Sequence, residues 1–106
     1  VYPINHTIVI KDAVLSDRPE IARSLFQAFK ASKDAYLARL GAKTAMEPAD
    51  EIAIANSQIV GDPFPFGIEP NRKALETVIN FGLGQNVISE RASVDDLFAV
   101  GTSGLV

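Results

Sequence analysis

The 106-residue chain contains no cysteine, no tryptophan and one histidine. Without cysteine it can form neither disulfides nor cysteine-ligated metal sites. Long hydrophobic runs are also missing, since the longest are far shorter than the roughly 20 apolar residues that span a membrane. Basic residues are not in excess, because the net charge is −3. The lysines and arginines are also dispersed, so we expect no nucleic-acid and no membrane partner.

Most familiar catalytic signatures are missing too. The sequence has no nucleophile elbow, no glycine-rich phosphate loop, no metal-type histidine pair and no zinc spacing. We therefore expect no metal and no cofactor. Two pairs of adjacent carboxylates, at residues 50–51 and 95–96, would diverge by about 100° on a helix. They are typical of solvated helix starts, which the helix dipole favours.

The chain nevertheless has an ordinary globular composition, with 47% hydrophobic and 22% charged residues. Residues 4–10 are mostly β-branched and apolar on both faces, which predicts one buried β-strand. No second strand is evident, and a solitary strand cannot satisfy its own backbone hydrogen bonds. The chain also starts without methionine, and the predicted strand follows almost at once. We therefore expect an α/β fold by origin, with residues 1–106 forming a single partial domain of a larger protein.

Helical patterns fill most of the remaining sequence. The longest predicted helix begins at Asp17, where Glu20 completes a capping-box pattern, and ends at Gly41. The sequence thus predicts one strand, three main helices and a short fourth. The other helices are expected to start between residues 45 and 48 and stop at residue 61, to run from about residue 70 to residue 86, and to cover residues 93–98.

Three places could carry chemistry. His6, within the apolar strand, would either make one buried hydrogen bond or line a cleft. The aromatic loop at residues 64–67 could be a ligand-facing wall or a contact between domains. The polar turn at residues 71–73 could bind an anion or be a solvated turn. The sequence alone leaves these alternatives open.

Four segments together resemble the C-terminal portion of the 4,5-dihydroxyphthalate decarboxylase family. The resemblance covers essentially the whole chain, and its specificity lies in the combination of segments. They are Tyr2-Pro3-Ile4-Asn5-His6-Thr7, Asp62-Pro63-Phe64-Pro65-Phe66-Gly67-Ile68, Asn71-Arg72-Lys73-Ala74-Leu75-Glu76, and Gln85 before Val94-Asp95-Asp96-Leu97-Phe98.

This resemblance implies a fold like that of the type 2 periplasmic binding proteins, in which two α/β lobes enclose a ligand cleft. The implied reaction is loss of CO2 from a dihydroxylated aromatic dicarboxylic acid in phthalate catabolism. The same fold also serves non-catalytic solute binding. A segment of a binding protein for an organic anion therefore remains the alternative.

The decarboxylation requires a proton at the carbon that loses CO2. His6 is the residue suited to donate or relay a proton near neutral pH, and Asn5 and Thr7 could hydrogen-bond a carboxylate or a phenol. These roles are inferred from residue type and position. The expected substrate is a small aromatic carboxylate, the expected compartment is the cytoplasm, and we expect the 106 residues alone to be inactive.

The last expectation concerns association. An unpaired strand at residues 4–10 would leave two open edges, and the rings of Phe64 and Phe66 would lack cover. Open edges favour pairing with another copy. The sequence therefore predicts a homodimer or higher oligomer, formed by strand pairing or by exchange of helices.

Overall fold

The computed structural model describes residues 4, 6–43 and 46–106, and 60% of this part of the chain is helical. The predicted α/β fold is wrong, because the described residues contain no β-strand. Residues 6–10, expected to form the strand, have no regular structure and are mostly exposed. The physical reason is that strand hydrogen bonds need a neighbouring strand, and the described remainder consists of helices and loops.

The first two helices are separated by a short break. Helix α1 (Asp12–Asp17) ends one residue before Arg18, and α2 (Ile21–Ala42) follows. The single long helix predicted from Asp17 is therefore wrong at its start, since Pro19 lies in the break and cannot donate a helical hydrogen bond. Helix α2 also continues past the predicted end at Gly41 to Ala42, and Lys43, which caps it, adopts a left-handed conformation with φ of 52°.

Helix α3 (Pro48–Val60) begins and ends as its sequence predicts. Pro48 occupies the first turn, where its missing N–H costs nothing. The backbone N–H of Glu47 donates a 2.8 Å hydrogen bond to Asp50 Oδ2, which caps the helix start. Gly61 ends the helix with φ of 80°.

The C-terminal half contains a cluster of buried hydrophobic side chains. It consists of the 3₁₀ turn η1 (Glu69–Asn71), helix α4 (Arg72–Gly84) and the 3₁₀ turn η2 (Asp95–Leu97). Two of the buried side chains that form this cluster lie in α4, one precedes the helix and one follows it, and Leu83 and Phe98 pack against them. They are Ile68, Leu75, Ile79 and Val94.

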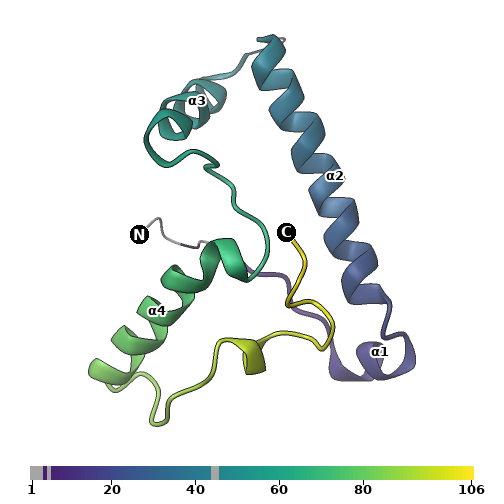
Figure 1. Ribbon diagram of the computed structural model, residues 1–106, viewed down its shortest axis with the longest axis vertical. Coiled ribbons are helices and arrows are strands. Elements are labelled where there is room, and N and C mark those ends of the chain that lie inside the picture. Colours follow the sequence, from purple (N-terminus) through teal and green to yellow (C-terminus); the bar gives the residue numbers. More distant parts are fainter. Residues whose placement is uncertain (1–3, 5, 44–45) are drawn as a thin grey trace.

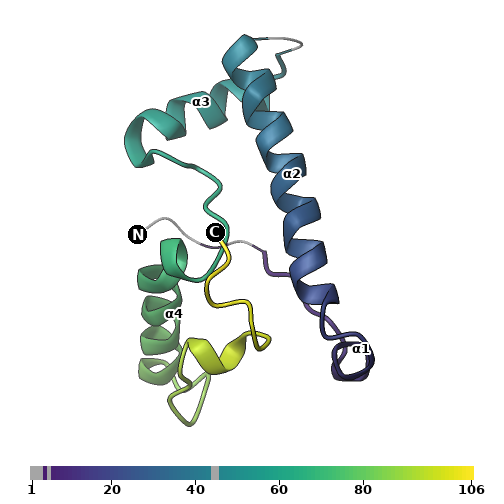
Figure 2. The same ribbon diagram turned by 45° about the vertical axis from the view of Figure 1, so that its right-hand side comes forward.

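The elements are arranged openly around a central segment at residues 61–68. Helix α2 runs along one side of the molecule, whereas α3 and α4 lie on the other and are joined by this segment (Figures 1 and 2). The radius of gyration is 16.2 Å, whereas a compact chain of this length has about 13 Å. The central segment therefore holds together helices that cover one another little.

Candidate functional site

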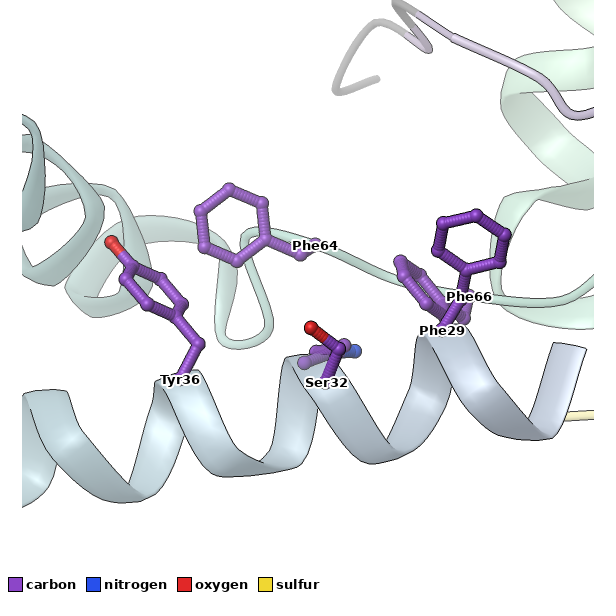
Figure 3. A pocket seen from close by; sticks show the side chains of 6 residues that line it. Phe29, Ser32, Tyr36, Phe64 and Phe66 are labelled. Carbon is purple, nitrogen blue, oxygen red and sulfur yellow. The ribbon is translucent and has the colours of Figure 1, made fainter. Parts of the chain in front are cut away.

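A groove lies between one face of α2 and the central segment. Phe29, Ser32 and Tyr36 are on successive turns of α2, and Lys33 lies beside them. The opposite wall consists of Phe64 and Phe66, which project from the central segment (Figure 3). The cavity has a volume of about 270 Å³.

Edge-to-face ring contacts hold the central segment against α2. The ring centroids of Phe26 and Phe66 are 6.2 Å apart, with an angle of 66° between the planes. Those of Tyr36 and Phe64 are 6.0 Å apart, at 65°. Such T-shaped pairs place the positive edge of one ring on the negative face of the other. Phe64 and Phe66 thus each contact a ring of α2, and Phe64 remains 38% exposed.

A cationic group lies among these rings. The ammonium group of Lys33 forms an ion pair with the carboxylate of Asp62 and lies 5.0 Å from the ring centroid of Phe66. The Lys33 side chain is only 10% exposed. Asp62 Oδ1 also accepts a 2.9 Å hydrogen bond from the backbone N–H of Phe64. One carboxylate therefore fixes both the lysine and the loop that carries the aromatic wall.

A second carboxylate supports the end of the groove near α3. Tyr36 donates a 2.7 Å hydrogen bond to Asp50 Oδ1, and Asp50 is only 4% exposed. The hydrogen bond from Tyr36, with that from the Glu47 N–H, holds the pKa of Asp50 below its usual value. The same bond raises the pKa of Tyr36. Asp50 is thus a buried structural group, and its prediction as part of a solvated helix start is wrong.

The polar turn at residues 71–73 is engaged within the chain. Asn71 Nδ2 donates hydrogen bonds to the carbonyl oxygens of Pro65 (2.8 Å) and Gly67 (2.9 Å). These bonds fix the end of the aromatic loop. They favour a structural role of this turn over anion binding.

Arg72 joins this turn to the C-terminal segment. Its guanidinium forms ion pairs with Glu69 and with Asp95, the latter through Nη2 and Oδ1 at 2.8 Å. The hydrogen bonds from Arg72 lower the pKa of both carboxyl groups, and they raise the pKa of Arg72. Asp95 therefore links two segments through an ion pair, which the prediction of a solvated helix start did not include.

The predicted site residues lie elsewhere. His6 and Thr7 are exposed in the segment before α1 and do not line the groove, and Asn5 lies outside the described residues. The structure does not bring His6 together with the aromatic loop. Sequence reasoning missed Lys33 and Asp62, although Lys33 lies four residues after Phe29 and so shares its helix face.

Other classes of site were also sought. No group of three or more His, Asp or Glu side chains that could hold a metal ion occurs in the described residues. Within the same residues, no helix has the length and apolar character needed to cross a membrane.

Comparisons with known proteins leave the family open: no protein-family model, no curated protein and no solved structure matches this chain. The candidate site therefore rests on the geometry of the groove.

Proposed function

We propose that this chain is part of a cytoplasmic decarboxylase that removes CO2 from a dihydroxylated aromatic dicarboxylic acid similar to 4,5-dihydroxyphthalate. The observation that carries the proposal is the groove, which four aromatic side chains line and in which the Lys33 ammonium lies 5.0 Å from the ring centroid of Phe66. Aromatic walls suit a planar ring, and an ammonium group suits a carboxylate. The segments at residues 62–68, 71–76 and 94–98, on which the family resemblance depends, are also joined by hydrogen bonds and core contacts.

The chemistry of this substrate class fits such a groove. The substrate ring would lie between the α2 face and the rings of Phe64 and Phe66, with one carboxylate near Lys33. This carboxylate would share the ammonium group with Asp62. An apolar surrounding favours decarboxylation, because it destabilises the carboxylate relative to neutral CO2.

The reaction breaks one carbon–carbon bond and releases CO2. The electron pair of that bond stays on the ring carbon, where it takes up one proton, and the product keeps both hydroxyl groups and the second carboxylate. Lys33 holds a carboxylate in this scheme, so a separate group must supply the proton. His6 and Thr7 do not line the groove. The proposed role of His6 as proton donor or relay, and the proposed substrate contacts of Asn5 and Thr7, therefore require the segment before α1 to reach the bound substrate in the full-length protein.

Binding of 4,5-dihydroxyphthalate to the 106-residue chain tests the groove. We expect Lys33→Gln to weaken binding about tenfold, measured by calorimetric or NMR titration, because the carboxylate loses its charged partner. Lys30→Gln is the matched control, since Lys30 pairs with Asp34 and does not line the groove. Equal affinity in the Lys33 variant and the unmodified chain would contradict the proposal.

Release of CO2 tests the enzyme assignment. We expect the full-length protein that contains this chain to release CO2 from 4,5-dihydroxyphthalate and the His6→Ala variant to be strongly impaired. Undiminished activity in this variant would remove His6 from the mechanism. Binding without CO2 release would favour the alternative, a solute-binding protein for an organic anion, and a signal peptide upstream of Val1 would support that alternative.

A further inference from the structure

The cationic side chain of the groove is already paired within the chain. Lys33 is the one charged residue among the six described residues that line the cavity. Its ammonium group forms an ion pair with the carboxylate of Asp62, which does not itself line the cavity. Because the Lys33 side chain is only 10% exposed, solvent screens this pair less than it screens a surface pair. A residue outside the lining therefore balances the charge of the groove.

Two contacts fix the position of the Asp62 carboxylate. Its Oδ2 atom pairs with Lys33 Nζ, whereas its Oδ1 atom accepts a 2.9 Å hydrogen bond from the backbone N–H of Phe64. Rotation of the carboxylate would break one of these contacts. A ligand carboxylate that approaches the ammonium group therefore meets the Asp62 carboxylate on the same nitrogen.

An ammonium group can hold two carboxylates, but the two repel each other. Lysine has three N–H donors, so donors remain for a ligand after one is directed to Asp62. Two carboxylates on one nitrogen lie a few ångströms apart, and their repulsion is stronger in a partly buried site than in water. This repulsion is absent for a neutral ligand and grows with each negative charge that the ligand carries.

We propose that Asp62 determines which ligand charge the groove accepts, because it opposes each carboxylate that shares Lys33 with it. Lys33 attracts anionic rings, and Asp62 weakens this attraction, most strongly for rings with two carboxylates. Asp62 is thus a positioning residue that acts through Lys33. The inference rests on the proposed function, since it requires carboxylate ligands to bind at Lys33. The substrate of the proposed reaction has two carboxylates and the product has one, so the repulsion favours loss of CO2.

Three ligands that share a benzene ring and differ in charge test this role of Asp62. At neutral pH benzamide is uncharged, benzoate has one carboxylate and phthalate has two. Asp62→Asn removes the charge but keeps an oxygen acceptor for the N–H of Phe64. By NMR titration of the full chain, we expect this variant to bind benzamide unchanged, benzoate about tenfold more tightly and phthalate more tightly still. The increase for benzoate is limited to this size because Asp62 is 44% exposed, so that solvent weakens the repulsion.

Asp34→Asn is the matched control. Asp34 also pairs with a lysine of α2, Lys30, but neither residue lines the groove. The substitution changes the net charge by the same amount, and we expect each affinity to change by less than about twofold. An equal effect of the two variants on benzoate and phthalate would overturn the inference. Far-UV circular dichroism of each variant checks that the helices are retained.

A second variant separates the charge of Asp62 from its hold on the loop. Asp62→Ala loses the acceptor for the N–H of Phe64 as well, so the aromatic wall loosens and every ligand binds more weakly than in Asp62→Asn. The ratio of phthalate affinity to benzoate affinity should nevertheless rise in both variants. An unchanged or lower ratio would show that Asp62 only anchors the loop and would overturn the inference.

The Lys33→Gln variant distinguishes failure of this inference from failure of the proposed function. Where Lys33→Gln weakens binding of benzoate and phthalate but Asp62→Asn changes all three affinities by the same factor, the groove stands and the role of Asp62 is wrong. Anion binding that is absent, or that does not depend on Lys33, would overturn both.

Discussion

At the scale of single residues, carboxylates determine the shape of the groove. Asp62 holds Lys33 and the N–H of Phe64, and Asp50 holds Tyr36 and the start of α3. Each of the two joins a side chain of α2 to a segment more than ten residues away in the sequence. Their loss should therefore open the groove as well as remove a charge.

The Tyr36–Asp50 hydrogen bond makes the free energy of unfolding decrease as the pH falls into the acidic range. Because the pKa of Asp50 is below its usual value in the folded chain, its contribution to stability is complete above the unfolded pKa. This contribution is lost as the pH falls through the folded pKa. Tyr36→Phe removes the largest cause of the shift, so we expect acid unfolding to begin at a higher pH than in the unmodified chain.

A pH titration followed by far-UV circular dichroism measures this effect. Ser32→Ala is the control, because Ser32 lies one turn away on the same face of α2 and lines the same groove. An acid-unfolding curve of Tyr36→Phe that coincides with that of the unmodified chain would contradict the role of this hydrogen bond.

At the scale of elements, the C-terminal segment packs closely against the aromatic loop. Gly67 has φ of 94°, and a Cβ atom at this position would overlap the carbonyl oxygen of Leu105. We expect Gly67→Ala to destabilise the chain by at least about 1–2 kcal/mol, since a positive φ alone costs a non-glycine residue this much. Urea unfolding measures the difference in free energy.

Gly104→Ala is the matched control for this substitution. A Cβ atom at Gly104 meets no other atom within 4 Å, and its φ is not positive. We expect a change within about 0.5 kcal/mol for this variant. Similar stabilities of the two variants would show that the C-terminal segment does not pack on Gly67 in solution.

The sequence allowed prediction of those elements whose signals are local. Pro48 and Gly61 mark the ends of α3, and both signals lie within the helix or next to it. The predicted start of α2 is wrong. Asp17 and Glu20 have the spacing of a capping box, which predicts a helix start at Asp17, but Asp17 is the last residue of α1 and α2 begins at Ile21. The strand predicted at residues 4–10 is wrong, because local β-preference does not supply the neighbouring strand on which a strand depends.

The candidate site was less predictable than the helices. The sequence indicates that Phe64 and Phe66 could form a ligand-facing wall. Their packing against α2, however, depends on contacts between segments that are distant in the sequence. The pairing of Lys33 with Asp62 spans 29 residues. No periodicity within α2 or within the loop specifies such a pairing, and the choice of His6 rests on its residue type and on its position in the predicted strand.

At the scale of the whole molecule, the open arrangement predicts that the unfolding free energy depends only weakly on urea concentration. The urea dependence of the unfolding free energy scales with the area exposed on unfolding, with slopes of about 1–3 kcal/mol/M for small proteins. We expect the monomeric chain to lie near 1 kcal/mol/M, because its helices cover one another little. Denaturation at low protein concentration measures this slope, and a value near the upper end would indicate a compact fold.

The same architecture has a consequence for the order of folding. Helices form in about a microsecond, whereas contacts between distant residues must first close the loop between them. Most hydrogen bonds of the described residues lie within helices or turns, but the groove requires Lys33 to meet Asp62 after α3 has turned the chain back. We therefore expect docking of the aromatic loop on α2 to be a late kinetic step, so that the groove forms after the helices that build it.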